Sequence, residues 1–175
     1  MADPWPLRLP FFFFGTLMDA DVLGRVVARP VVESELAPAM LWGHRRYAVR
    51  GAVYPVIRQE RASHVPGVLF QPRSMDERLR IDHFEAGEYE ARPRRVQAGA
   101  RLTNALVYLD LEGVFELATA PWSFERWQAA EKPAYLARCD SWMADYVPPR
   151  SGLSRPAGSS LGGRAGLRTM PTGGR

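Results

Sequence analysis

Apolar residues along the chain follow two patterns: short runs typical of strands, and longer stretches in which they recur at helical spacing. The short runs are rich in β-branched and aromatic residues and are bounded by polar or turn-forming residues, which favours strands. Six strands are predicted on this basis, at residues 11–14, 39–49, 52–58, 64–71, 94–98 and 105–111. Gly43 is expected to break the second strand, and Pro55 and Pro66 indicate edges or bulges.

The first stretch with helical spacing covers residues 19–30. Either Asp19 or Asp21 can cap its N-terminus, and Pro30 is expected to stop it. Its apolar residues fall on one face: Val22, Leu23, Val26 and Val27. We therefore predict an amphipathic helix directly after the first strand.

Two further stretches are predicted to be helical. In residues 74–89, Ser74 and Glu77 have the spacing of a capping box, and Gly87 marks the end. The last stretch contains Pro133, which either kinks one helix or starts a second. It has one apolar stripe, made of Tyr135, Cys139, Trp142, Met143 and Tyr146.

About six strands and three or four helices that do not alternate regularly favour an α+β fold. We expect a small closed or half-closed mixed β-barrel with flanking helices. Residues 1–147 are predicted to form the one domain. Residues 148–175 are rich in Gly, Pro, Ser and Arg and are predicted to be disordered. A solvated tail is favoured over an arm that touches an acidic partner or a membrane, because the arginines are spread rather than clustered.

The positive charge of the chain belongs to its C-terminal tail. The formal net charge is +4, but the five arginines after Val147 are accompanied by no acidic residue, which leaves about −1 for the rest. A nucleic-acid-binding domain carries its basic residues as a patch on folded structure, so no nucleic-acid partner is predicted. The apolar run 11–14 is far shorter than the about 20 residues of a membrane span or the about 7–15 of a signal sequence. With a single cysteine, this predicts a cytoplasmic protein without a membrane partner.

Familiar metal and nucleophile motifs are absent from the sequence. His44, His64 and His83 are scattered and do not have the spacing of metal ligands. Cys139 lies on the apolar stripe of a predicted helix, which favours a core residue over a nucleophile. No metal site is predicted.

The turn at Phe14, Gly15, Thr16 and Leu17 is the first candidate site. A buried strand enters a glycine and then a helix start, where backbone N–H groups point outward together and can bind a carboxylate or an oxyanion. An ordinary strand-to-helix turn, in which the glycine supplies only conformational freedom, is the alternative.

Glu85 is the second candidate. It follows Phe84 near the end of a predicted helix, where the helix dipole opposes a negative charge. If the side chain is also partly buried, its pKa rises and it becomes a usable general base. The alternative is a solvated surface charge.

Six short motifs follow one another along the body: FFFFGTLMD, GHRRYAVRGAVYPVI, VPGVLF, IDHFEAGEYEAR, ALVYL and WSFERWQ. In this order they resemble the gamma-glutamylcyclotransferase family, most closely its avirulence-induced-gene-like branch. The resemblance covers about residues 11–146. It implies a small β-barrel with flanking helices and an intramolecular acyl transfer. The α-amine of a γ-glutamyl amine or amino acid attacks its own γ-carbonyl, which forms 5-oxoproline and releases the amine.

The resemblance also implies roles for particular residues. Glu85 matches the catalytic glutamate of the family. The substrate carries its own nucleophile, so no cofactor is predicted. The substrate-binding loop is implied to comprise Phe14, Gly15, Thr16, Leu17, Met18 and Asp19. Tyr54, Tyr89 and Tyr108 are candidates for lining the pocket, with a packing role as an equal alternative.

Two residues depart from the family pattern. Phe14 stands where the family has a tyrosine, and Arg92 comes one residue late, which places it on the opposite strand face unless a bulge corrects the register. These departures motivate a second hypothesis, a non-catalytic ligand-binding or interaction module on the same fold.

Overall fold

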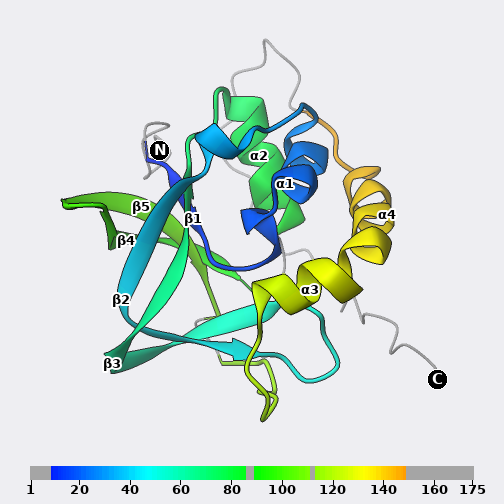
Figure 1. Cartoon of the computed structure of the whole chain (residues 1–175). Coiled ribbons are helices and arrows are strands. Elements are labelled where there is room, and N and C mark those ends of the chain that lie inside the picture. The colour runs from blue at the N-terminus through cyan, green and yellow to red at the C-terminus, as the bar shows by residue number, and fades with distance from the viewer. Residues whose placement is uncertain (1–8, 86–88, 111–112, 149–175) are drawn as a thin grey trace, which may run out of the picture.

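The computed structural model describes residues 9–85, 89–110 and 113–148. The strands in this part close into a barrel in the order β1-β3-β2-β4-β5, with the helices on one side (Figure 1). The strands are β1 (Phe11–Phe13), β2 (Ala37–Ala48), β3 (Pro55–Phe70), β4 (Glu90–Ala98) and β5 (Arg101–Leu109). β1 pairs with β5 in parallel and the other pairs are antiparallel, so the predicted mixed barrel is confirmed. All of the predicted tail except Pro148 lies outside the described residues.

The described part of the barrel has five strands rather than the six predicted. The segments 52–58 and 64–71 were expected as separate strands, but they belong to the single strand β3. The polar residues 60–63 between them stay in the strand as an irregularity opposite Gly43. The Glu60 carboxylate stabilises this irregularity by accepting hydrogen bonds from a tyrosine hydroxyl of β2 and a serine hydroxyl of β3. Gly43, with φ 75°, bends β2 there instead of breaking it.

The four consecutive phenylalanines alternate between two cores. Phe11 and Phe13 pack in the cluster between the barrel and the helices, whereas Phe12 and Phe14 fill the barrel interior. This alternation follows from the two-residue period of a strand, and all four side chains are buried. β1 is therefore held from both faces, which fixes the turn that follows it.

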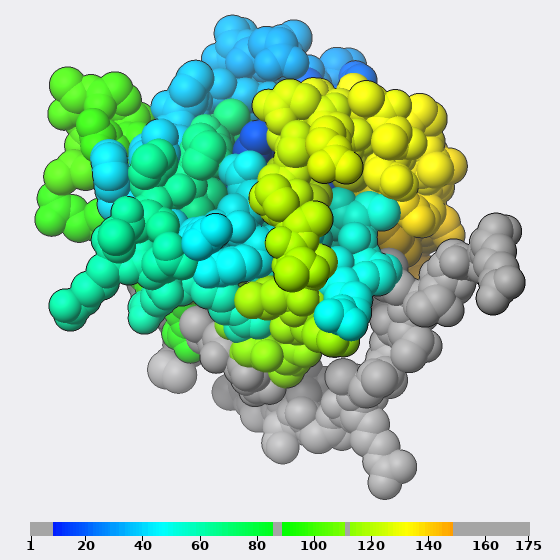
Figure 2. Space-filling model, turned by 60° about the horizontal axis from the view of Figure 1, so that its bottom comes forward, coloured from blue at the N-terminus to red at the C-terminus, as the bar shows by residue number. Residues whose placement is uncertain are grey.

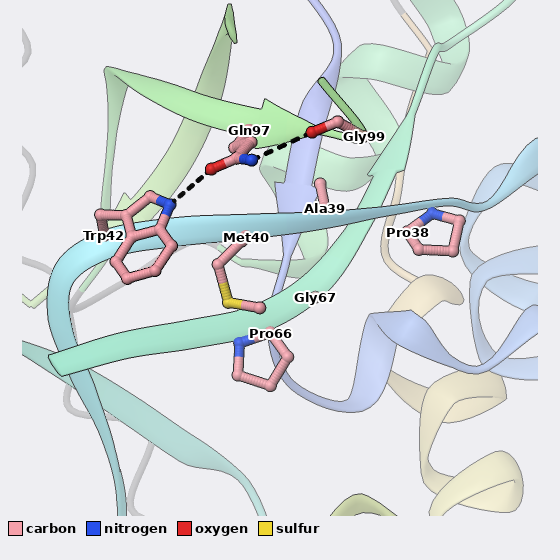
Figure 3. Close-up of a pocket in the computed structure, with 8 residues that line it drawn as sticks. All are labelled: Pro38, Ala39, Met40, Trp42, Pro66, Gly67, Gln97 and Gly99. Carbon is pink, nitrogen blue, oxygen red and sulfur yellow. Dashed lines mark hydrogen bonds between the residues drawn. The ribbon is translucent and has the colours of Figure 1, made fainter. Parts of the chain in front are cut away.

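An open pocket of about 350 Å³ lies on the barrel surface between β2, β3 and the β4–β5 hairpin (Figure 3). Trp42 Nε1 donates to Gln97 Oε1 at 2.9 Å, and Gln97 Nε2 donates to the Gly99 carbonyl oxygen at 3.0 Å. The lining residues are Pro38, Ala39, Met40, Trp42, Pro66, Gly67, Gln97 and Gly99. None of them has an ionisable side chain, so this pocket offers no acid or base and is separate from the candidate site.

The helices in the described residues are α1 (Ala20–Val27), α2 (Met75–Phe84), α3 (Phe124–Ala130) and α4 (Lys132–Met143), with 3₁₀ turns η1 (Thr16–Met18) and η2 (Glu33–Glu35). Asp19, one of the two predicted caps, accepts the N–H groups of Asp21 at 3.1 Å and Val22 at 3.2 Å. α1 ends at a left-handed Ala28 with φ 58°, ahead of Pro30. No helix in the described ranges is long and apolar enough to cross a membrane.

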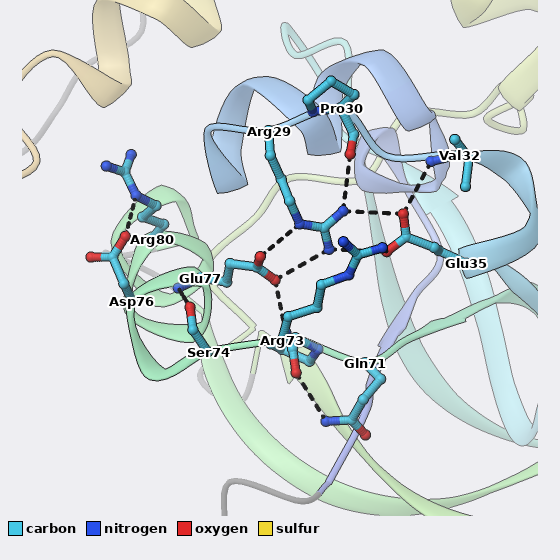
Figure 4. A network of polar contacts seen from close by, with 11 residues as sticks. Arg29, Pro30, Val32, Glu35, Gln71, Arg73, Ser74, Asp76, Glu77 and Arg80 are labelled. Atoms are coloured by element: carbon cyan, nitrogen blue, oxygen red, sulfur yellow. Dashed lines mark hydrogen bonds and ion pairs between the residues drawn. The ribbon is translucent and has the colours of Figure 1, made fainter.

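A network of ion pairs ties the end of α1 to the start of α2 (Figure 4). Arg29 donates from Nε to Glu77 Oε1 at 2.7 Å, and its Nη2 lies 3.0 Å from Glu35 Oε2. Arg73 Nη2 lies 3.0 Å from the same Glu35 oxygen. Glu77 is largely buried, so these charges are screened less than surface pairs. The network therefore fixes the position of α2 against α1.

The predicted cap of α2 is confirmed, with one change. The Ser74 hydroxyl accepts the Glu77 N–H at 3.2 Å. The Glu77 carboxylate accepts a hydrogen bond from the N–H of Arg73 at 2.8 Å. In a complete capping box it would accept the N–H of Ser74 instead. α2 ends at Phe84, while the predicted stop residue Gly87 lies outside the described residues. Glu85 thus occupies the C-terminal cap.

The last predicted helical stretch consists of two helices. Pro133 lies in the first turn of α4, so it starts a second helix rather than kinking one. Tyr135 and Cys139 are buried, and further members of the predicted stripe pack partly buried against the same core. The segment before α3 lies across the region of β2 and β3 in the view of Figure 2.

Candidate active site

The turn after β1 forms one side of the candidate site. Gly15 packs so closely on Pro55 that a Cβ at this position would lie 3.1 Å from Pro55 Cδ, which explains the glycine. The N–H groups of Met18 and Asp19 are used within the turn, at 3.0 Å and 3.1 Å. The N–H groups of Gly15 and of the two residues after it donate to no described residue. They are the backbone donors of the turn that its own hydrogen bonds leave unused.

The side chains of the predicted loop contribute mainly to the fold. Phe14 fills the barrel and Leu17 is buried in the helix-side core. The Asp19 carboxylate accepts a hydrogen bond from Gln128 Nε2 at 2.8 Å and pairs with Lys132 Nζ at 2.9 Å. Burial acts to raise the pKa of Asp19, but the hydrogen bonds from Lys132 and Gln128 outweigh it and hold the pKa below its ordinary value. Asp19 is therefore charged and structural.

Glu85, the second candidate, lies at the end of α2 as its C-terminal cap. Its N–H donates to the Ile81 carbonyl oxygen at 3.0 Å, and the residue is partly buried. Burial raises the pKa of Glu85 to about 7. Among the described residues, no hydrogen bond or ion pair to its carboxylate offsets this rise. The predicted rise in pKa is therefore found.

Several tyrosines gather around Glu85. Burial raises the pKa of Tyr89, Tyr108 and Tyr135, and the negative charge of Glu85 adds to the rise in each. Because charges interact over longer distances in a buried, low-dielectric environment, this effect places the three tyrosines in the same buried region as Glu85 without requiring direct contact. Tyr54 belongs to the same group, because it adds to the rise at Tyr89 and Tyr135.

Two of the predicted tyrosines have different surroundings. The Tyr89 hydroxyl donates to the Pro55 carbonyl oxygen at 3.4 Å, which places it under the proline on which Gly15 packs. The Tyr108 hydroxyl donates to the Asp82 carboxylate on α2. Tyr89 thus contacts the residue on which Gly15 packs, whereas Tyr108 is bound to the body of α2.

Tyr135 was not predicted as a site residue. Its hydroxyl and Thr16 Oγ1 lie 3.0 Å apart, and both residues are buried. This hydrogen bond joins α4 to the Gly15 turn across 119 positions of the chain. In the sequence, Tyr135 lies on an apolar stripe, a signal that indicates only the core. The contact that brings it to the site is tertiary.

Arg92 does not reach the site. β4 and β5 pair without a register shift, with Ala91 opposite Tyr108 and Arg92 opposite Val107. No bulge therefore moves the arginine to the other strand face. Its half-exposed side chain forms an ion pair with Glu90 instead.

Solved structures of other proteins share this barrel. Two solution structures of Arabidopsis thaliana proteins match with TM-scores of 0.57 and 0.56, each at 21% sequence identity. The matches cover 79% and 86% of this chain, and 83% and 100% of the other two chains. The likeness is one of fold, and it confirms the predicted gamma-glutamylcyclotransferase-like architecture of a small barrel with flanking helices.

Sequence comparison identifies the family. The family described as "Gamma-glutamyl cyclotransferase, AIG2-like" matches residues 11–128, and the chain belongs to it. Its relatives include AIG2-like protein A of Arabidopsis thaliana, 27% identical over 131 residues, which are 71% of this chain and 75% of that protein. AIG2-like protein C of the same plant is 27% identical over 146 residues, 80% of this chain and 81% of that protein. The family match ends before α4, so Tyr135 lies outside it.

Proposed function

We propose that the protein is a γ-glutamylcyclotransferase-type enzyme, which cyclises a γ-glutamyl amine or amino acid to 5-oxoproline and releases the amine. The observation that carries the proposal is Glu85, whose carboxyl has a pKa raised by burial to about 7. It shares a buried region with Tyr135, which is hydrogen-bonded to Thr16 in the Gly15 turn. A group with a pKa near the working pH serves best both as a base and as an acid. The family and the fold favour this class of reaction.

In the proposed reaction, Glu85 moves the protons. Its carboxylate accepts a proton from the substrate α-ammonium, and the free amine attacks the γ-carbonyl carbon. The new C–N bond closes the five-membered ring. Protonated Glu85 then gives its proton to the leaving nitrogen as the old C–N bond breaks. The nitrogen of the new ring still carries one proton too many. Glu85 accepts this proton and passes it to the released amine, which leaves as an ammonium.

The Gly15 turn stabilises the negative charge on oxygen. Attack on the carbonyl generates an oxyanion, and preorganised backbone N–H groups are effective donors for it. Three such groups, beginning at Gly15, donate to no described residue. Because the nucleophile is part of the substrate, the remaining task is to hold the amine and the carbonyl in contact. Tyr54 and Tyr89 are proposed to line the pocket that does so.

A second candidate function is a binding module that holds a γ-glutamyl-like ligand without turning it over. The observation that favours it is Arg92, which pairs with Glu90 instead of facing the site. Phe14 supports it as well, since a phenyl ring in the barrel interior offers no hydroxyl to a ligand.

The test is 5-oxoproline formation from γ-glutamyl amino acids, γ-glutamyl amines and glutathione. Wild-type protein is expected to form it, and Glu85→Gln is expected to lose at least about 100-fold in kcat. The matched control is Glu33→Gln, at an exposed glutamate of η2, which should retain wild-type activity. Equal activity in Glu85→Gln and wild type would exclude the role of Glu85. Calorimetric binding of the same compounds without product would favour the binding module.

A further inference from the structure

Arg46, on the bent end of β2, is an arginine that lacks an acidic partner in the described residues. Its Nε is buried there without a hydrogen-bond partner. Nη2 donates to the Pro66 carbonyl oxygen and lies 4.0 Å from Met18 Sδ. No hydrogen bond from Nη1 to a described residue is found. Burial lowers the pKa of Arg46 to about 10, with only an opposing effect from the charge of Glu125. The charge of Glu125 offsets this only in part, and the two side chains form no ion pair. A desolvated cation without a paired anion is unfavourable, and such groups are usually completed by one.

Arg46 lies beside the proposed substrate site. Met18, which it touches, is the last residue of η1 in the Gly15 turn. Its guanidinium also lies 5.2 Å from the centroid of the Trp122 ring. Trp122 in turn donates from Nε1 to the Val53 carbonyl oxygen at 2.9 Å, next to Tyr54. The cation is therefore placed between the Gly15 turn and the segment that carries Tyr54.

Arg46 and the proposed base act at different places. Arg46 contacts Met18 Sδ and the Trp122 ring, whereas Glu85 caps the C-terminus of α2, and no contact between the two residues is found in the described part of the chain. In a γ-glutamyl substrate, the α-carboxylate is two bonds from the attacking amine and must lie near the base. A carboxylate at the far end of the leaving group lies farther away, and its position suits Arg46 better.

We propose that Arg46 binds a carboxylate at the distal end of the leaving group, so that the enzyme selects γ-glutamyl amino acids and peptides over γ-glutamyl amines. This inference rests on the proposed cyclotransferase function. The guanidinium has donors left for a carboxylate, and a charge-assisted hydrogen bond to one is stronger than a neutral bond. The Trp122 ring holds the guanidinium plane in place.

The experiment compares substrates that differ only in this carboxylate. γ-Glutamyl-alanyl-glycine is paired with its C-terminal amide, and γ-glutamyl-alanine with γ-glutamyl-alaninamide. Wild-type protein is expected to prefer the longer acid over its amide by at least about tenfold in kcat/KM, mostly through KM. Arg46→Met, which keeps an apolar stem, should bring this ratio close to one, and Arg46→Lys should give an intermediate ratio. The control is Arg45→Met, at an exposed arginine paired with Glu60, which should keep the wild-type ratio.

Each other outcome has a distinct meaning. Equal kcat/KM for acid and amide in the wild type would overturn the role of Arg46 and leave the cyclotransferase in place. So would an Arg46→Met variant that slows both substrates equally and keeps the ratio. If Arg46→Met does not fold, the wild-type ratio and the Arg46→Lys ratio decide. No 5-oxoproline from any of the four compounds would overturn the proposed function, and this inference with it.

Discussion

Replacing Glu85 with glutamine should stabilise the fold at alkaline pH and change it little at acid pH. Burial raises the pKa of Glu85 from 4.5 to about 7 in the folded protein. A carboxyl whose pKa is higher in the folded than in the unfolded state contributes stability below the unfolded value, and that stability is lost as the pH rises through the folded value. Between these two pKa values the wild type should lose about 1.4 kcal/mol per pH unit, or about 3 kcal/mol in total. Glutamine carries no charge and avoids this loss.

Thermal unfolding followed by circular dichroism measures the difference. The melting temperature of Glu85→Gln should exceed that of wild type by roughly 6–12 °C at about pH 8 and by nearly nothing at about pH 4. Glu33→Gln removes an exposed charge and should show no such dependence on pH. The reasoning is refuted if Glu85→Gln is no more stable than wild type at the higher pH, or if the difference is the same at both.

Three further substitutions test the connections of the site. Tyr135→Phe leaves the buried Thr16 hydroxyl unpaired, so urea titration should show that the free energy of unfolding falls by about 1–3 kcal/mol. The formation of 5-oxoproline should slow as well. Unchanged stability would contradict the hydrogen bond. Gly15→Ala brings a Cβ to within 3.1 Å of Pro55 and should shift the turn, with a loss of about 1 kcal/mol and at least about tenfold in kcat/KM. A fully active alanine variant would show that the turn does not bind the reacting atoms. Asp19→Ala removes the α1 cap and the ion pair with Lys132, and it should cost more than the roughly 1–2 kcal/mol of a cap alone. Asp19→Asn should recover only the part due to the cap, since asparagine caps but carries no charge.

Local chemistry explains which parts of the fold could be predicted. The Asp19 and Ser74 caps, the buried face of α1 and the buried strand of phenylalanines depend on neighbours a few residues away, and each is found as expected. The division at Pro133 was left open between a kink and a new helix, because proline allows both. The strand count was wrong because the polar stretch 60–63 resembles a loop. It is held in the strand by hydrogen bonds to Glu60, one of which comes from the neighbouring strand.

The candidate site likewise has residues that the sequence could predict and residues that it could not. The raised pKa of Glu85 could be anticipated from Phe84 and the helix end, although burial alone is its cause in the structure. Tyr135 could not be anticipated, because its partner Thr16 is 119 positions away and its own pattern indicates packing. Arg46 gave no signal either, since an arginine on a strand is ordinarily a surface residue. Its lack of an acidic partner is a property of the folded neighbourhood.

The most direct test of the central claim is the pH dependence of kcat/KM for 5-oxoproline formation. If buried Glu85 is the base, the wild-type profile should rise with pH through a midpoint of about 7. The Glu85→Gln variant should lack this rising limb and retain only a small fraction of the activity. A wild-type profile without a limb near this pH, or the same limb and activity in Glu85→Gln, would contradict the claim.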